Sequence, residues 1–419
     1  MAATTDADAA VAAAKAKLAE LYEVHDHFFC ADKTEKQSKL RALADDVVAL
    51  VDAIPLQEYR QLRATVFYLK GKALDAFPSY DATAEQLLSQ AAKLDPCNLD
   101  AWVALGNCFW KKGDLLVAKN CFENCLEYGS SKHALRSLSM VLRKLGTKPE
   151  DKADHVRASL QRAKQAVSLD LTDGESWYVL GNAYLALFFG DSHSTVDLDR
   201  SLAAYTRAEK AGAGQNPDLH FNRANVQRYK EDYAEAVASY LRAHELDPSL
   251  RAIDLVEAIV QYTKHVSGLV LRKARLSPKK LSQLAGNVPP PVDIQGRSPC
   301  PIASLQLGLN EGVVIALKLL ADVPRNHEPP GCFIMMDSAE TSCAVSVYHL
   351  DSEASVKITD DDTVYVLDPC LRVMSLAYNS TTISYHCVHV AEPHLFLING
   401  KVVASSYAHA EVQLDNFDA

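Results

Sequence analysis

The residues that could carry out chemistry are scattered along the chain without a catalytic pattern. The string HCVH places two histidines and a cysteine at 386–389, and His25 and His27 lie two apart near the start. Residues three apart on a strand, or two apart on a helix, point in different directions, so neither group suits one metal ion. The nucleotide pattern G-x-x-x-x-G-K-[ST], the hydrolase pattern G-x-S-x-G and the zinc pattern H-E-x-x-H are absent from the sequence. We therefore expect no enzyme activity, no catalytic residues, no metal and no cofactor.

A repeated spacing of large and small residues extends over the first 250 positions. From Asn98 onward the spacing W-x2-L-G-x2-Y, then A-x3-F, is met by Trp102, Leu105, Gly106, Phe109, Ala118 and Phe122. It returns at Trp177, Leu180, Gly181 and Tyr184, and its second half at Ala236 and Tyr240. Small residues allow two antiparallel helices to cross closely, and the aromatic residues fill the space between them. This spacing resembles the tetratricopeptide repeat, a helix-turn-helix of about 34 residues that stacks into a solenoid.

The distances between copies predict the domain organisation. The last small residue of each copy falls at 91, 125, 166, 208 and 243. The two long intervals add residues in GTKPEDKAD and GDSHSTVDLD, which we interpret as lengthened turns between helices. We predict an N-terminal helical cap or degenerate repeat at 1–60, tetratricopeptide repeats at 61–250 and a closing helix at 251–276.

In the last third of the chain, apolar and polar residues alternate with a period of two. Three prolines at 289–291 exclude a continuous helix, so residues 277–304 are predicted to be a basic, Pro-rich linker. Several short alternating apolar segments follow, from GVVIALKLLADV to HLFLING. Five or more strands in a segment of this length favour a small all-β barrel of the OB-fold type at 305–414, with a β-sandwich as the alternative. The predicted fold class is an α-solenoid followed by this barrel.

Composition and charge narrow the function further. The chain has 419 residues, of which 48% are hydrophobic, and no run of about 18 apolar residues lacks a charge, so we expect no membrane span. Asp6 and Asp8 argue against a targeting peptide, and the ten cysteines form no C-x-x-C pair, which predicts reduced core thiols inside the cell. Residues 285–419 hold 16 acidic and 6 basic residues, a net charge of −10. This balance disfavours nucleic acid as a ligand of the barrel, although a nucleic-acid-binding regulator acting through the OB fold remains the alternative function.

The repeat register also predicts which residues line the groove of the solenoid. On the first helix of each repeat, positions 4, 8 and 11 pack inward, while positions 2, 5, 9 and 12 form the stripe that faces the concave side. Position 9 is asparagine in three repeats, and an amide can hold both the N–H and the C=O of a bound peptide backbone. The candidate peptide-binding residues at these positions are Asn107, Arg143, Asn182, Asp218, Asn225 and Arg228.

Local strings make the resemblance more specific. They are LSMVLRKL at 138–145, SWYVLGNAYL at 176–185, NPDLHFNRA at 216–224, SPKKLSQL at 277–284 and HLFLINGK near the end. Together with five repeats and a terminal OB-type domain, they resemble the tetratricopeptide repeat protein five family, also called Strap. The resemblance covers nearly the whole chain after about the first 50 residues.

The resemblance implies a non-enzymatic adaptor of cytoplasm and nucleus that binds protein peptides. Members are described as transcription coactivators of the stress response that scaffold an acetyltransferase complex. They are also described as ribosome-associated readers of the nascent tubulin N-terminus in tubulin autoregulation. The resemblance assigns the peptide to Arg143 and Asp218 and the ribosome to Lys279, beside Lys280. The chain departs from the family at two positions. Ala252 occupies a position where the family has an acidic residue, and Ser277 occupies one where it has a basic residue.

Overall fold

The computed structural model describes residues 2–28, 33–145, 149–290, 292–324, 330–350 and 358–403. It divides into two compact units, which are treated separately below. Among the described residues, the first unit comprises 2–223 and 242–251, and the second comprises 224–241 and 252–403. The end of the last repeat is thus shared between a helical unit and a unit that contains the barrel.

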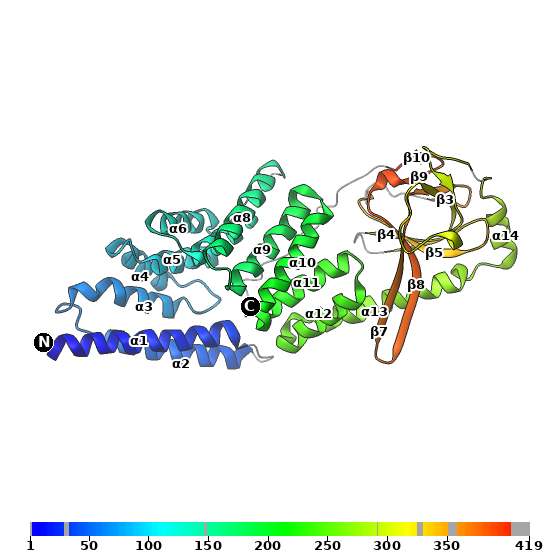
Figure 1. The fold of residues 1–419 in the computed structure, drawn as a ribbon. Helices are drawn as coiled ribbons and strands as arrows, with labels where there is room; N and C mark the ends of the chain where they lie inside the picture. Colours follow the sequence, from blue (N-terminus) through cyan, green and yellow to red (C-terminus); the bar gives the residue numbers. More distant parts are fainter. Residues whose placement is uncertain are drawn as a thin grey trace. The chain divides into compact units, whose positions relative to one another are not determined.

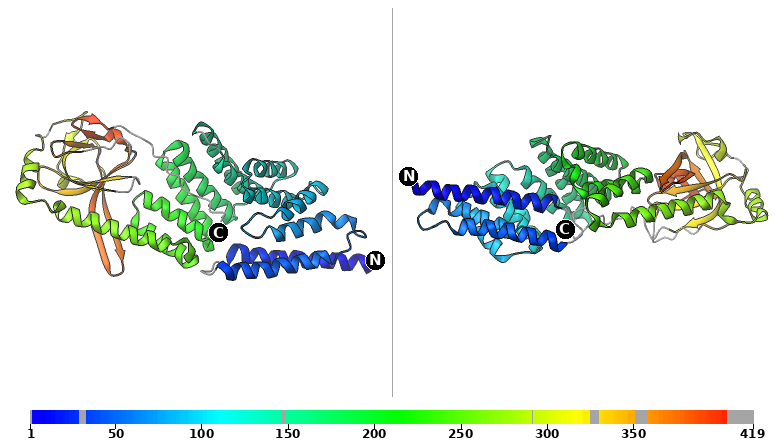
Figure 2. Two further views of the ribbon diagram at one scale, coloured as in Figure 1. Left: turned by 180° about the vertical axis from the view of Figure 1, so that it is seen from behind. Right: turned by 90° about the horizontal axis from the view of Figure 1, so that it is seen from below.

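The helical unit is built from antiparallel helix pairs (Figure 1). Packed pairs are α1 with α2, α3 with α4, α5 with α6, α7 with α8 and α9 with α10, and the views in Figure 2 agree with this pairing. The bounds are α1 Ala2–His27, α2 Lys33–Asp52, α3 Arg63–Leu74, α4 Ala82–Leu94, α5 Leu99–Lys112, α6 Leu115–Tyr128, α7 Lys132–Lys144, α8 Pro149–Leu169, α9 Gly174–Leu187 and α10 Thr195–Lys210. Residues of both units make up α11 Pro217–Tyr229 and α12 Tyr233–Leu246. The paired helices confirm the solenoid that the repeat spacing predicts.

Side-chain caps begin many of these helices, because the first N–H groups of a helix lack partners within it. Asp81 Oδ1 accepts from the N–H groups of Thr83 and Ala84, which starts α4. Asn98 and Asp173 cap α5 and α9 in the same way. The polar residues between repeats therefore define where each helix starts.

The small residue of the repeat spacing is required where paired helices touch. A Cβ added to Gly181 of α9 would lie 2.5 Å from Cε1 and 2.6 Å from Cδ1 of Tyr205, on α10. Tyr205 is fully buried. The aromatic ring thus fills the space that the missing side chain leaves, as the sequence pattern predicts.

The two longer intervals between repeats lengthen helices, which corrects their interpretation as turns. Most of GTKPEDKAD belongs to α8, a helix of 21 residues, while residues 146–148 lie outside the described part. In the second case α9 runs on into a π-helical segment, Phe188–Ser192, where Phe188 is buried. Extra residues that bury apolar side chains continue the helix, because its backbone hydrogen bonds are then kept.

The second unit holds an all-β domain whose described strands form one sheet of order β10-β9-β6-β3-β4-β5-β8-β7-β2, with β1 pairing β3. Neighbours are antiparallel except for the pairs β1–β3 and β5–β8. The bounds are β1 Ser298–Pro299, β2 Gly308–Leu309, β3 Val313–Val323, β4 Gly331–Met336, β5 Ser342–Val347, β6 Val364–Leu367, β7 Cys370–Tyr378, β8 Thr381–Val390, β9 Phe396–Ile398 and β10 Lys401–Val402.

Strand β3 links the two halves of the sheet. Its first residues, 314–317, pair with β6, and 318–323 pair with β4 across an irregularity between Leu319 and Ala321. Buried residues from both halves, including Ile315, Val345 and Phe396, form one apolar core. This sharing is typical of an OB-type barrel and differs from the two separate sheets of a β-sandwich, the alternative left open by the sequence.

Two further helices belong to the unit with the barrel. Helix α13, Ala252–Leu271, packs against β8, β5 and β4 (Figure 1). Ser342 Oγ donates to the carbonyl of Val270 at 3.0 Å, and Ser267 Oγ donates to that of Ser384 at 3.3 Å. Helix α14, Pro278–Gly286, occupies the start of the predicted linker. The segment predicted as a basic, Pro-rich linker thus begins with a short helix, because Ser277 caps it and Pro278 suits its first position.

Candidate peptide-binding face of the repeats

The first helices α5, α7, α9 and α11 carry the positions predicted to face the groove. Helix α7 packs against both α5 and α9, so these three first helices lie side by side. We call positions 2, 5, 9 and 12 of these helices the inner stripe. The six predicted peptide-binding residues lie on it by register, but their exposure and their partners differ.

Arg143, at position 12 of α7, has its guanidinium positioned by two neutral hydroxyl groups. Nη1 donates to Ser139 Oγ at 3.1 Å and to Ser159 Oγ at 3.4 Å, and the two serine oxygens lie 2.9 Å apart. Both serines are fully buried, whereas Arg143 is half-buried. The two hydroxyl groups orient the guanidinium, and an oriented guanidinium suits recognition of a carboxylate.

Asp218, at position 2 of α11, lies in the first turn of that helix and is half-buried. Its backbone N–H donates to Asn216 Oδ1 at 2.9 Å, and the N–H of Leu219 donates to the same oxygen at 3.3 Å. Asn216 therefore caps α11, and this cap orders the first turn, which carries the Asp218 side chain. Arg143 and Asp218 both belong to the helical unit, so one unit supplies both a cation and an anion.

Asn182 does not lie on an open surface, contrary to its prediction as a groove residue. Its side chain is 0% exposed, and its Oδ1 accepts from the Tyr205 hydroxyl at 2.7 Å and from Asn222 Nδ2 at 3.2 Å. Asn222 Nδ2 also donates to the Tyr178 hydroxyl at 3.2 Å. Asn182 instead joins α9, α10 and α11, because side chains from the two neighbouring helices cover it.

The other two asparagines and Arg228 have different surroundings. Asn107 and Arg228 are half-buried. Asn225 Oδ1 accepts from the Tyr240 hydroxyl at 2.6 Å, which ties α11 to α12. The amide of Asn225 thus has a structural hydrogen bond, and the register alone does not show this.

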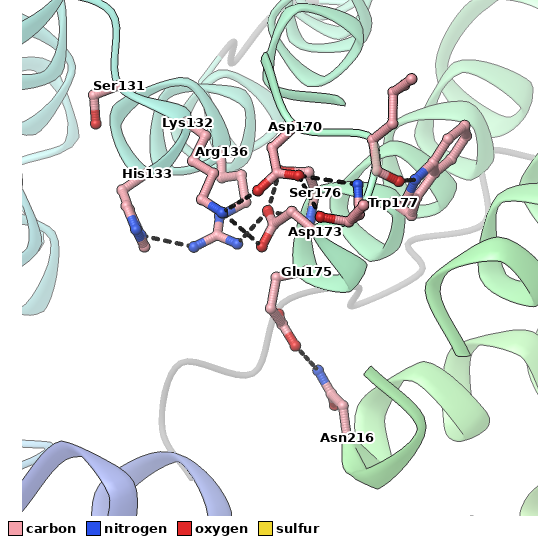
Figure 3. Close-up of polar contacts among 12 residues, drawn as sticks. Ser131, Lys132, His133, Arg136, Asp170, Asp173, Glu175, Ser176, Trp177 and Asn216 are labelled. Atoms are coloured by element: carbon pink, nitrogen blue, oxygen red, sulfur yellow. Dashed lines mark hydrogen bonds and ion pairs between the residues drawn. The ribbon is translucent and has the colours of Figure 1, made fainter. Parts of the chain in front are cut away.

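A network of charges that the sequence analysis did not single out lies between α7 and α9 (Figure 3). Arg136 Nη1 donates to Asp173 Oδ2 at 2.9 Å, and Lys132 Nζ lies 2.7 Å from Asp170 Oδ2 and 3.3 Å from Asp173 Oδ1. Arg136 also contacts His133 Nδ1 at 2.7 Å. Opposite charges inside the network pair with one another, so its main role is to hold α7 against the start of α9.

Glu175 stands beside this network with its side chain exposed (Figure 3). Asn216 Nδ2 lies 3.5 Å from Glu175 Oε1. The pKa of Glu175 is raised, chiefly because surrounding protein replaces water, and the positive charge of Arg136 opposes this rise. Burial also lowers the pKa of His133, as does the charge of Arg136. His133 and Arg136 occupy positions 2 and 5 of α7, and Glu175 occupies position 2 of α9, so the inner-stripe register could have identified all three.

The two lysines predicted to contact the ribosome lie on α14. Lys279 is exposed, while Lys280 is half-buried and its Nζ lies 2.5 Å from Asp360 Oδ2. Ser277 Oγ accepts from the Lys280 N–H at 3.3 Å. Ala252 is fully buried at the start of α13, so the acidic position that the resemblance expects there is occupied by a packing residue.

No group of three or more metal-binding side chains occurs within the described ranges. The helices of the described residues include none that is long and apolar enough to cross a membrane.

The comparisons with known proteins agree with this architecture. The family model for the tetratricopeptide repeat protein 5 OB fold domain matches residues 297–412, and tetratricopeptide repeat models match 99–128 and 217–250. Tetratricopeptide repeat protein 5 of Homo sapiens is 36% identical over 368 residues, covering 83% of this chain and 82% of that protein. The Bos taurus protein of the same name is 34% identical over 397 residues, covering 90% and 87%.

Among solved structures, a tetratricopeptide repeat protein from Thermus thermophilus aligns with 47% of this chain and 99% of its own, at 18% identity and a TM-score of 0.40. The two relatives have similar lengths to this chain and match it across both the repeats and the OB domain. The chain therefore belongs to the tetratricopeptide repeat protein 5 family.

Proposed function

We propose that the protein is a non-enzymatic adaptor that binds a short peptide on the inner stripe of its repeats. In this proposal Arg143 binds a carboxylate of the peptide, and Asp218 binds its basic group. The observation that carries the proposal is the half-buried Arg143 guanidinium, which two buried serine hydroxyls hold in one orientation. An oriented cation and a half-buried anion in one unit would select a peptide that carries both charges.

The partner favoured by the family resemblance is the N-terminal peptide of nascent tubulin at the ribosome. An acetyltransferase coactivator complex in the nucleus is the other partner that the resemblance implies. In the first role Lys279 would contact the ribosome, because it is exposed on α14, whereas Asp360 already pairs with Lys280. Neither role requires chemistry on a bound substrate.

The test is calorimetric titration of the full chain with a synthetic peptide of the tubulin N-terminus. Hydrogen bonds between charged groups contribute about 1.5–3 kcal/mol, so Arg143→Ala or Asp218→Ala should weaken binding roughly tenfold to a hundredfold. Lys119→Ala is the matched control, because it removes a charge that pairs with Glu123 on α6, a second helix. Unchanged affinity in both inner-stripe variants would show that the peptide binds elsewhere.

The ribosome contact needs a separate experiment. Co-sedimentation of the protein with ribosomes should be lost in Lys279→Glu. It should be retained more fully in Lys280→Glu, because Asp360 already pairs with Lys280 in the wild type. Both changes lie at the surface of α14, so the melting temperature should change little. Wild-type sedimentation of Lys279→Glu would remove the ribosome from the proposal.

A further inference from the structure

A pocket of about 360 Å³ lies between α1, α3 and α5, within the helical unit. Its volume falls near the lower end of the range for ligand sites, roughly 300–1,000 Å³. The walls that matter here are formed by Lys15, Leu18 and Tyr22 of α1, Tyr68 and Lys72 of α3, and Asp100 of α5. Position 8 of the α3 repeat is Gly71, so Tyr68 and Lys72 are positions 5 and 9, which correspond to inner-stripe positions of the later repeats. None of these six residues is among the six predicted peptide-binding residues, although Asp100 lies at position 2 of α5.

Lys72 is the central charged group of this pocket. Its Nζ donates to the Tyr68 hydroxyl at 3.2 Å and lies 4.8 Å and 5.6 Å from the ring centroids of Tyr22 and Tyr68. The ammonium group is thus held by two rings and a neutral hydroxyl. Tyr22 in turn donates to the carbonyl of Lys72 at 3.1 Å, which fixes the ring beside the lysine stem.

The nearby carboxylates do not neutralise Lys72 directly. Asp75 pairs with Lys111 at 3.3 Å, and Asp26 lies 2.6 Å from His25 Nδ1. Asp100 is exposed at the first turn of α5. Burial lowers the pKa of Lys72 although Asp100, Asp26 and Asp75 each act to raise it. Desolvation of the ammonium therefore outweighs the attraction of these three acids, and an anion bound next to Lys72 would stabilise its charged form.

We propose that this pocket binds a carboxylate carried on an apolar stem. Lys15 and Lys72 would bind the carboxylate, while Leu18 and the two tyrosine rings would surround the stem. The lining of the pocket contains two lysines and one acidic residue, Asp100, so the balance of charge favours an anion over a cation. Such a group occurs as the C-terminal carboxylate of a chain that ends in an apolar residue, or as a glutamate side chain within a peptide.

This site goes beyond the proposed function, because its ligand needs no basic group and touches neither Arg143 nor Asp218. It gives the adaptor a second point of attachment for a protein partner. Two weak sites joined through one partner bind more tightly than either site alone.

The experiment follows the acetylation rate of Lys72 by acetic anhydride in the full-length protein, measured by mass spectrometry. One probe is an acetylated tetrapeptide, Gly-Gly-Ser-Leu, with a free C-terminus, compared with its carboxamide. The second is acetylated Gly-Glu-Leu-Gly carboxamide, compared with the same peptide carrying Gln. Near saturation the acid probes should slow Lys72 acetylation by about fivefold or more, because a bound carboxylate shields the amine and raises its pKa. Lys70, which pairs with Asp52 on the neighbouring helix α2, should be unaffected.

The outcomes separate the two sources and also test the proposal itself. Protection by only the free C-terminus identifies a chain end as the ligand, and protection by only the Glu peptide identifies a side chain. Equal protection by the neutral peptides, or no protection by any probe at millimolar concentration, would overturn the proposal.

Variants provide a second test that does not depend on Lys72 chemistry. Lys15 is exposed, so the Lys15→Gln variant should fold normally. In a calorimetric titration its affinity for the acid peptide that protects Lys72 should be lower by about fivefold or more. Lys17→Gln is the matched control, because Lys17 lies on the same helix but pairs with Glu20 at 2.8 Å. Equal affinities of Lys15→Gln and Lys17→Gln for that probe would overturn the placement of the carboxylate.

Discussion

The change Gly181→Ala tests the close helix crossing on which the repeat depends. The added methyl group would approach Cε1 and Cδ1 of Tyr205 to 2.5 and 2.6 Å, so the ring must move. Tyr205 is fully buried, and its hydroxyl donates to Asn182 Oδ1 at 2.7 Å. Movement of the ring therefore disturbs a packed core and a buried hydrogen bond together.

Two opposing effects set the magnitude. Alanine favours a helix interior over glycine by roughly 1 kcal/mol. Overpacking a core costs about 1–3 kcal/mol, and weakening the hydrogen bond to Asn182 costs about 1 kcal/mol more. Packing should outweigh propensity, and we expect the free energy of unfolding of the repeats to fall by about 1–3 kcal/mol.

The assay is urea unfolding followed by tryptophan fluorescence, combined with amide hydrogen exchange. All three tryptophans, Trp102, Trp110 and Trp177, lie in the repeats, so the fluorescence reports on the helical unit. The control is Gly268→Ala on α13, where no atom lies within 4 Å of the added Cβ. That variant should slow exchange in α13, because only the gain in helix propensity remains. If Gly181→Ala raised the urea midpoint of unfolding, the argument from close packing would be refuted.

Polar groups that are buried or half-buried offer further tests. Burial raises the pKa of Asp75 to about 6, above its unfolded value, so its contribution to stability is present at low pH and lost as the pH rises. Between about pH 4 and pH 7 the wild-type chain should lose up to about 3 kcal/mol relative to Asp75→Asn, and parallel stability curves would contradict this assignment. Ser159→Ala should weaken peptide binding about threefold to tenfold, since Ser159 Oγ helps to position Arg143, and calorimetry with an unchanged affinity would show that Arg143 needs no such support. Arg372→Ala removes hydrogen bonds to the Lys230 carbonyl at 2.9 Å and to Asp232 Oδ1 at 2.5 Å, so amide exchange at 230–233 should accelerate, and exchange at the wild-type rate would contradict a bracing role.

Much of the fold could be predicted because the relevant signals are local. Spacings such as Trp177, Gly181 and Tyr184 record contacts within one helix pair, and such a pair recurs along the chain. Alternation of apolar residues identified strands of the barrel such as Thr381–Val390. Both signals arise from burial on one face of a single element, which the order of residues alone encodes.

The candidate site depended on contacts between elements, and there the sequence was less informative. The register placed Asn182 on the inner stripe, yet Tyr205 and Asn222 from two other helices cover it and use its amide oxygen. Position 9 specifies a direction from one helix axis, and the neighbouring helices decide whether that direction reaches solvent. The same reason explains why Arg143 could be singled out from the sequence while its two serine partners were missed.

The repeat class, the all-β end domain and the charge of each region follow from the order of residues, because composition and periodicity are properties of the chain. Only the tertiary structure showed that α14 replaces part of a linker, that extra residues lengthen α8 and that α1 forms one wall of the pocket around Lys72. Helix α1 lacks the repeat signature, so nothing in its residues specifies which helices it meets. Packing against α3 brings Tyr22 to Lys72, and such a pairing of residues 50 positions apart arises only when the chain is folded.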